Sequence, residues 1–491
     1  MAHFLKNKPA FLLLLPFFFV LHEFTRNYYA VSVADSLLLT LIYFACSFII
    51  ACICWLLYRD TIKAGLLAFA LMAYQFFFGN IQDALKNISD SFISQYRFIF
   101  PASLLLFILF SVWLKKRKKT LLLLNYYLNI LLVTLIIIDA AWLVKKLSSD
   151  KSYMAINKTM TGHIIPDSCA KPDIYLLLVD QYAGNSTLNE IYHFDNSPFL
   201  DELKNRGFFI AKNSRSNYNL TPFSMASALS MNYLDPEMAL KTKLNLSYCY
   251  QAIRNSSVVD FLTGNGYHFY NYSVFDFPGQ PAHKYEAFLP YGIKLVTLNT
   301  FTGRITRDIR SGITEGKFGF KSARKKLVYE NLYYNDSTFK LTRNIASEKS
   351  SSPKFIYSHF MLPHFPYYFD REGNPLPIDK LTDFKRTNSN DYIEYLLYGN
   401  KKILSLVDDI LAHSANPPVI MILSDHGSRH LNKGEEVTND FVNLNAMYIP
   451  GKNYALCYDS ITNVNQFRVL FNTCFAQQLP LLKDSISDIK Y

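Results

Sequence analysis

The sequence has few charges inside its long apolar segments, no CxxC or zinc-ribbon spacing, and no internal repeat. Ion and substrate pathways through membranes usually need several buried charges, and Asp139 is the main one here, which argues against a transporter. The missing cysteine spacing excludes a zinc ribbon. The missing repeat excludes a solenoid, in which a unit of fixed length recurs.

Apolar residues are abundant and concentrate before residue 146. Of the 491 residues, 50% are hydrophobic and 16% are aromatic, which is too apolar for an ordinary soluble protein. Five segments approach the ~20 residues needed to cross a hydrocarbon core of about 30 Å. They are Ala10–Phe24, Ser36–Leu57, Ile62–Phe78, Phe98–Leu114 and Leu121–Val144. The first is short and contains Pro16, so a cleaved signal peptide is the alternative for it.

Lysine and arginine placement predicts the orientation of these spans. The basic run KKRKK at 115–119 joins the fourth and fifth spans, whereas the alternate loops hold only scattered basic residues. We therefore expect the amino terminus inside, and an odd number of spans delivers the chain after Lys146 to the outside. The net charge of +11 includes this run, which is typical of a topology anchor beside anionic lipid, and it does not indicate a nucleic-acid partner.

Three regions follow from this pattern: a transmembrane helical domain at 1–147, a linker at 148–171 and an outer domain at 172–491. In the outer domain, strand-like and helix-like segments alternate, which favours an α/β fold with a mostly parallel central sheet flanked by helices. We expect strands at Pro172–Val179, Tyr267–Tyr272, Phe355–Met361, Pro418–Ser424 and Asn445–Ile449, and helices at Ser197–Arg206, Pro222–Ser230 and Asp391–His413. The stretch 297–352 has few strong signals and is not assigned.

Two of the expected strands run directly into acidic residues. Pro172–Val179 ends at Asp180, and Pro418–Ser424 ends at Asp425-His426-Gly427. Continuous apolar runs of this kind are typical of central parallel strands that are covered on both faces. Ligands bind just beyond the carboxyl ends of such strands. Two acids and a histidine that meet there would form a cation site.

Thr221 and Pro222 stand at the start of an expected helix. The simple interpretation is that Thr221 caps the helix and Pro222 is its first residue. The functional interpretation uses the same position, because a hydroxyl at a helix N-terminus faces backbone N–H groups and the positive end of the helix dipole, which suit a phosphate. A divalent cation on the same oxygen would make it a nucleophile.

Four sequence blocks resemble the sulfatase-like branch of the alkaline phosphatase superfamily. They are PDIYLLLVDQYAG at 172–184, SRSNYNLTPFSMASALSMNYL at 214–234, FIYSHFMLPHFPYYFD at 355–370 and SDHG at 424–427. Together they span nearly all of the outer domain. The five-span anchor is similar to that of membrane-anchored lipoteichoic acid synthases and lipid A phosphoethanolamine transferases.

This resemblance implies roles for individual residues. Asp180, Asp425 and His426 would be metal ligands, and Thr221 would be both a ligand and the catalytic nucleophile. His364 falls where relatives place a histidine that touches the substrate phosphate or a second metal, and it would be catalytic as well.

Two more histidines are weaker candidates, and one departure from the family matters. His430 is a possible substrate or second-metal residue, although its spacing after Asp425-His426 is shorter than in the phosphoethanolamine transferases. His359 is equally well explained as a hydrogen-bonded core residue. True sulfatases convert a Cys or Ser in a Cys/Ser-x-Pro-x-Arg segment into an aldehyde. Thr221 cannot make that aldehyde, so sulfate-ester hydrolysis is not expected.

The expected function combines this site with the apolar spans. Carboxylate, hydroxyl and imidazole ligands suit one divalent ion, with Zn²⁺ or Mn²⁺ favoured over Ca²⁺. The resemblance implies a multi-pass protein of the bacterial plasma (inner) membrane with its catalytic domain on the extracytoplasmic side. It would move a phospholipid-derived head group, through a phosphothreonine intermediate, from a phospholipid donor to a cell-envelope lipid or glycan acceptor.

Two alternatives stay open at this point. A phosphodiesterase or phosphatase of the same superfamily would transfer the phosphoryl group to water, and nothing in the sequence distinguishes water from another acceptor. A non-catalytic envelope protein would keep the domain as a binding module. Against the second alternative, every position assigned as a metal ligand or nucleophile holds a residue that is chemically able to act as one.

Overall fold

The computed structural model describes residues 2–28, 31–88, 92–156, 160, 162–235, 246–283, 292–383, 389–428 and 437–489. The chain divides into two compact units. The first, called here the helical unit, contains Met1–Tyr153 and Ala287–Ser311. The second, called here the sheet unit, contains Met154–Glu286 and Gly312–Tyr491.

The helical unit is built from long apolar helices. They are α1 (Ala2–Asn7), α2 (Phe11–Asn27), α3 (Val33–Tyr58), α4 (Thr61–Ile88), α5 (Tyr96–Lys116) and α6 (Leu122–Ile156). Within the part of the chain that the structure describes, 4 helices, α3 to α6, are suited by length and composition to cross a membrane. The first predicted span corresponds to α2, which has 17 residues with Pro16 inside it. All five expected apolar segments are helical, but α2 is not among the described helices that are long and apolar enough to cross a membrane, so four of the five expected spans are supported.

A segment from much later in the chain belongs to the helical unit. It contains α13 (Ile293–Thr297) and the start of α14 (Phe301–Thr314). Val296 is buried in the same apolar cluster as Phe11 and Phe76. The outer domain expected from the sequence included these residues, whereas their contacts group them with the apolar helices.

The sheet unit contains a 6-stranded sheet with the strand order β2-β6-β5-β1-β4-β3. The strands are β1 (Ile174–Val179), β2 (Phe209–Ile210), β3 (His268–Tyr272), β4 (Lys354–Phe360), β5 (Val419–Ser424) and β6 (Asn445–Tyr448). β5, β1, β4 and β3 run parallel, while β6 is antiparallel to both β5 and β2. In this register Val179 pairs with Phe360 and with Ser424, so the three central strands end at one edge. The mostly parallel sheet is confirmed.

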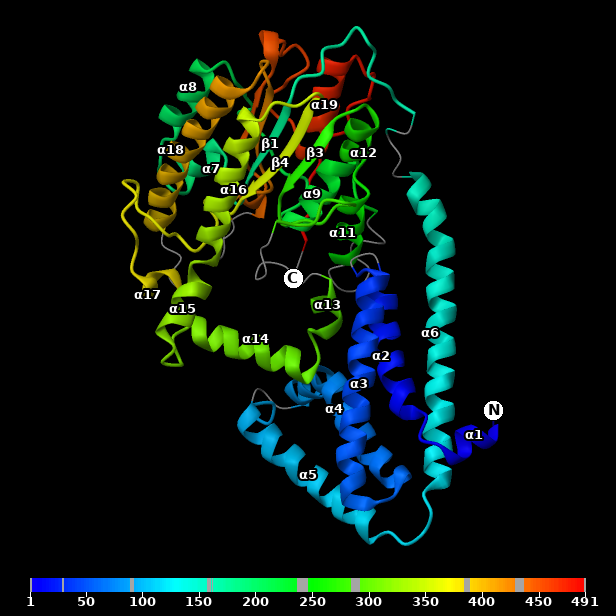
Figure 1. Ribbon diagram of the computed structural model, residues 1–491. Helices are drawn as coiled ribbons and strands as arrows, with labels where there is room; N and C mark the ends of the chain where they lie inside the picture. Colours follow the sequence, from blue (N-terminus) through cyan, green and yellow to red (C-terminus); the bar gives the residue numbers. More distant parts are fainter. Residues whose placement is uncertain are drawn as a thin grey trace. The chain divides into compact units, whose positions relative to one another are not determined.

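Helices cover both faces of this sheet (Figure 1). One side has α7 (Asn185–Glu190), α8 (Ser197–Asn205), α16 (Glu330–Ser347) and α18 (Ser389–His413); the other has α9 (Thr221–Ser230), α11 (Leu246–Arg254), α12 (Ser257–Gly264) and α19 (Asn463–Phe475). The remaining elements are α15 (Lys321–Val328), α17 (Ile378–Leu381) and the short 3-10 helices Val437–Asp440 and Pro450–Lys452. The predicted α/β fold with helices on both faces is therefore present.

The central strands are apolar on both faces because both faces are covered. Tyr175, Leu177 and Val179 of β1 join the core cluster that includes Leu406 of α18. On the opposite face, the ring of Phe355 in β4 contacts that of Phe467 in α19 at a centroid distance of 6.2 Å. Full burial of such side chains contributes about 1.5–3 kcal/mol each. The sheet edge that carries the candidate ligands is thus held by a closely packed core.

Candidate functional site

The two acids predicted from the sequence lie together at the carboxyl ends of β1 and β5. Asp180 follows Val179 and Asp425 follows Ser424, and these two strand residues pair in the sheet. Ligand atoms of Asp180, Asp425 and His426 lie within 4.8 Å of one another. All three side chains are buried.

Helix α9 brings Thr221 to the same place. Thr221 Oγ1 donates a hydrogen bond to Asp425 Oδ2 at 2.5 Å and lies 3.4 Å from His426 Nε2. The simple interpretation of Thr221 as a capping residue is wrong. Thr221 is the first residue of α9, the N-cap position belongs to Leu220, and no side chain caps the helix. The helix begins one residue earlier than the Thr-Pro pattern predicts, and the hydroxyl bonds to the acid that follows β5 rather than to the backbone of its own helix.

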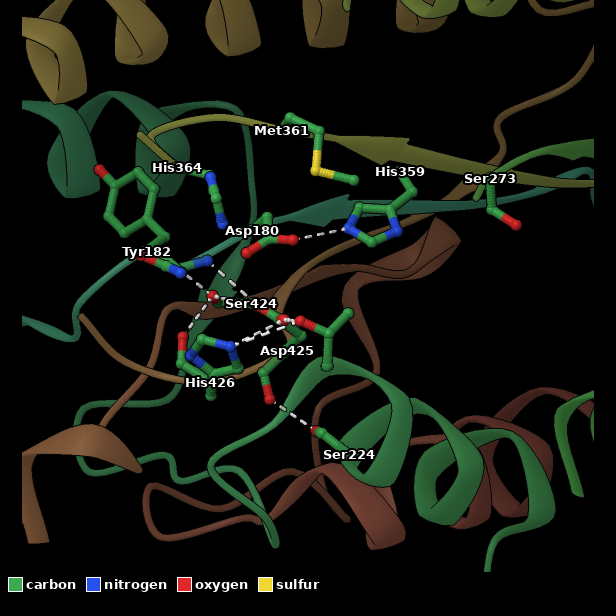
Figure 2. A network of polar contacts seen from close by, with 12 residues as sticks. Asp180, Tyr182, Ser224, Ser273, His359, Met361, His364, Ser424, Asp425 and His426 are labelled. Atoms are coloured by element: carbon green, nitrogen blue, oxygen red, sulfur yellow. Dashed lines mark hydrogen bonds and ion pairs between the residues drawn. The ribbon is translucent and has the colours of Figure 1, made fainter. Parts of the chain in front are cut away.

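Asp425 is held from several directions (Figure 2). The backbone N–H of Gln181 donates to Asp425 Oδ1 at 3.1 Å. One turn after Thr221 on α9, Ser224 Oγ donates to the Asp425 carbonyl oxygen at 2.6 Å. Ser424 Oγ donates to the His426 carbonyl oxygen at 2.7 Å. These bonds tie β1, β5 and α9 together at the candidate ligands, and the role of Ser224 was not predicted from the sequence.

His426 is oriented by its own backbone neighbour. Nδ1 lies 2.7 Å from the Gly427 carbonyl oxygen, which assigns the ring proton to Nδ1. Nε2 then faces the site, 3.2 Å from Asp425 Oδ2. The imidazole nitrogen and the carboxylate oxygen therefore converge on one point, where a cation could contact both. A Cβ added at Gly427 would be 2.5 Å from the Asn439 carbonyl oxygen, so only glycine fits after His426.

His359 supports Asp180 from the neighbouring strand. His359 Nε2 lies 3.2 Å from Asp180 Oδ2, and both side chains are fully buried. Asp180 Oδ1 is also buried and has no hydrogen-bond partner among the described residues. The sequence left His359 open as a core histidine. The structure places it in contact with a candidate ligand, because β4 pairs with β1.

The pKa values of the two carboxyl groups are pushed apart. Burial, and next the negative charge of Asp180, raise the pKa of Asp425 to about 6. Burial also opposes ionisation of Asp180, but His364, His359 and His426 outweigh it and lower its pKa to about 2. A buried site that keeps two carboxylates ionised at neutral pH needs a compensating positive charge.

His364 lies in the loop that follows β4. Its ring is beside Asp180, whose pKa it lowers, and its Nδ1 contacts the Phe365 carbonyl oxygen (Figure 2). His430, the other histidine singled out from the sequence, lies outside the described residues. The structure thus brings five of the six predicted site residues into one place and does not describe the sixth.

This donor set fits a divalent cation. Asp180 offers an unpaired buried oxygen, Asp425 a second carboxylate, His426 its Nε2, and Thr221 a hydroxyl oxygen. Four ligands of this kind are typical of transition-metal sites. A cation there would also offset the negative charge of the two buried carboxylates.

Comparison with solved structures finds several that are similar to part of this chain. The C-terminal periplasmic domain of EcEptC from Escherichia coli is 13% identical over 63% of this chain and 84% of its own, with a TM-score of 0.38. The C-terminal periplasmic domain of phosphoethanolamine transferase EptC from Campylobacter jejuni is 13% identical over 63% of this chain and 92% of its own, with a TM-score of 0.36. A putative sulfatase from Bacteroides thetaiotaomicron is 14% identical over 65% of this chain and 74% of its own, with a TM-score of 0.39. No curated protein matches the chain.

The family assignment comes from the sequence of the sheet unit. The sulfatase family model matches residues 172–469, which is more than half of the chain. The matched range includes both strands that carry the acids, the start of α9 and the loop after β4. The chain therefore belongs to the sulfatase family of enzymes.

Proposed function

We propose that this protein is a membrane-anchored, metal-dependent phosphotransferase with Thr221 as its nucleophile. The observation that carries the proposal is the 2.5 Å contact between Thr221 Oγ1 and Asp425 Oδ2, inside a buried set of candidate ligands. A sulfatase of the aldehyde type needs Cys or Ser at the nucleophile. A threonine hydroxyl at a helix start instead suits attack on phosphorus.

Asp180, Asp425, His426 and Thr221 would hold one divalent cation, with Zn²⁺ or Mn²⁺ favoured by the mixed oxygen and nitrogen ligands. When bound, the cation lowers the pKa of the threonine hydroxyl and offsets the negative charge of a substrate phosphate. The positive end of the α9 dipole acts in the same direction, because Thr221 is the first residue of that helix.

The Thr221 proton is directed at Asp425 Oδ2, which is therefore its first acceptor. Oγ1 then forms a bond to the phosphorus of a phospholipid head group, and the bond from phosphorus to the glycerol oxygen breaks. The diacylglycerol leaves with a proton that His364 supplies, since its ring lies beside Asp180 and so near the reacting atoms. An acceptor hydroxyl then attacks the phosphorus of the resulting phosphothreonine ester and gives its proton to His364. The bond from phosphorus to Oγ1 breaks, and Oγ1 takes back the proton held by Asp425.

The apolar helices explain why the donor would be a lipid. Four helices long and apolar enough to span a bilayer precede the catalytic unit in the same chain. With α2 counted as the fifth span, lysine and arginine placement predicts that this unit lies on the extracytoplasmic side of a bacterial inner membrane. The acceptor would then be an envelope lipid or glycan on that side.

The test uses the full chain in detergent, loaded with Zn²⁺ or Mn²⁺, and a phospholipid that carries a fluorescent acyl chain. We expect release of labelled diacylglycerol and a phosphorylated adduct that peptide mass spectrometry maps to Thr221. Lipid and glycan extracts of cells with and without the protein separate the activities, because a transferase adds mass to an acceptor and a hydrolase does not. If no phospholipid releases diacylglycerol, the proposed activity is refuted, and a non-catalytic binding module is the alternative that remains.

A further inference from the structure

Helix α14 begins in the helical unit and ends in the sheet unit, and its first half is firmly anchored. Arg304 binds both carboxylate oxygens of Asp83 in α4, at 3.1 and 2.7 Å, and its side chain is 8% exposed. The Phe301 ring lies 5.1 Å from that of Phe78. Tyr96, the first residue of α5, donates a hydrogen bond to Asp308. All these partners are near the end of α4 and the start of α5, where these two helices leave their apolar stretch.

The backbone supports the same anchor. Gly79 N donates to the Asn299 carbonyl oxygen at 2.8 Å, and a Cβ added at Gly79 would be 2.6 Å from that oxygen. Arg304 also donates to Asn299 Oδ1 at 2.8 Å. Residues 299–308 are thus fixed at the end of the helical unit by a close approach and a bidentate ion pair.

The chain that continues from this anchor is strongly basic. Residues 304–326, RITRDIRSGITEGKFGFKSARKK, hold eight lysines and arginines against two acidic residues. Lys321, Lys325 and Lys326 are exposed, and none of the three forms an ion pair with a residue that the structure describes. Three unpaired cations within one turn and a half of α15 make a concentrated positive charge.

Exposed aromatic rings lie next to these lysines. The side chains of Phe318 and Phe320, in the loop between α14 and α15, are 42% and 62% exposed. The loop folds back on the end of α14, since Lys317 N donates to the Gly312 carbonyl oxygen at 2.8 Å and Arg324 Nε to that of Thr314 at 3.1 Å. The rings and the lysines therefore belong to one short, ordered segment.

We propose that residues 317–326 are a docking surface for the bilayer, in which Lys321, Lys325 and Lys326 bind the phosphates of anionic phospholipids and Phe318 and Phe320 enter the interface. A bilayer fits better than a soluble partner, because the segment continues directly from a helix that is fixed to the helical unit. Exposed aromatic residues beside unpaired lysines are typical of interfacial binding. The proposal is independent of the catalytic role of Thr221.

The test measures lipid contact in the full chain reconstituted in nanodiscs. Trp55, Trp113 and Trp142 are first replaced by Phe, so that Phe320→Trp is the single tryptophan. In a matched control the single tryptophan is Leu456→Trp, an exposed position at 46% in the sheet unit. Both proteins are placed in phosphatidylcholine alone and in phosphatidylcholine mixed with phosphatidylglycerol, with brominated acyl chains as the quencher.

We expect quenching at position 320 at least about twofold stronger than at 456 in the phosphatidylglycerol bilayer, and weaker at 320 without the anionic lipid. Lys321→Ala/Lys325→Ala/Lys326→Ala should bring the two positions close to equal. Quenching at 320 no stronger than at 456 in either bilayer would overturn the proposal. So would quenching at 320 that neither the anionic lipid nor the triple substitution changes, because the lysines would then have no part in binding.

Discussion

Replacing Thr221 by valine isolates the one atom on which the proposed chemistry depends. Valine has nearly the shape of threonine, and the side chain is 2% exposed, so the substitution removes the hydroxyl without opening a cavity. The loss leaves Asp425 Oδ2 without its 2.5 Å donor. In the metal-free protein that should lower the free energy of unfolding by about 1–3 kcal/mol.

The effect on catalysis should be far larger. If Oγ1 is the nucleophile, Thr221→Val should lower diacylglycerol release from a labelled phospholipid by at least about 10⁴-fold, as removal of a nucleophile does elsewhere. Thr221→Ser keeps the hydroxyl and should stay within about tenfold of the natural protein. Metal content, measured by plasma mass spectrometry, should change little in either variant, because three of the four ligands remain.

Two results would refute this reasoning. One is turnover in Thr221→Val above about a tenth of the natural rate. The other is a covalent adduct in the natural protein that maps to a different residue. A variant that loses both metal and turnover would instead show that the hydroxyl acts as a ligand, and Thr221→Ser would then decide whether it also attacks.

Four further predictions concern the metal and the residues that support it. Because the pKa of Asp425 is raised to about 6, protons compete for this ligand and metal affinity should fall as pH drops through 6, which titration against a chelator at several pH values measures. The pKa of Asp425 is 3.8 in the unfolded chain and about 6 in the folded one, so deprotonation of this group should destabilise the metal-free protein as the pH rises from 3.8 through 6. A melting temperature that rises over this range would contradict the prediction. His359→Phe should weaken metal binding by about 10–100-fold while the melting temperature of the loaded protein changes little, since His359 orients Asp180. Gly427→Ala should cost about 2 kcal/mol or more in thermal unfolding, because its Cβ would be 2.5 Å from the Asn439 carbonyl oxygen.

The central strands and the edge on which the acids lie could be predicted from the sequence. The apolar runs that end at Asp180 and Asp425 are long, and burial on both faces is the main reason for such runs. β2 has only two residues, too few for a pattern. The contact of His359 with Asp180 depends on the pairing of β4 with β1, which local sequence does not encode.

The position of α13 and α14 could not be predicted for a similar reason. Their anchor consists of single residues of α4, among them Gly79 and Asp83, more than two hundred positions earlier in the chain. The α14 sequence is polar on average and gives no membrane signal. Its assignment to the helical unit depends on an ion pair and a close backbone approach rather than on hydrophobicity.

The return of residues 293–308 to the apolar helices has a consequence for dissecting the protein. Excision of the catalytic half by a single cut after α6 would carry this stretch away from everything that shields it. Val296, 1% exposed in the intact chain, would face water together with Phe301, and Arg304 would lose Asp83. Such a fragment is expected to precipitate or to require detergent, so its behaviour in solution would be a poor guide to the enzyme in its native setting.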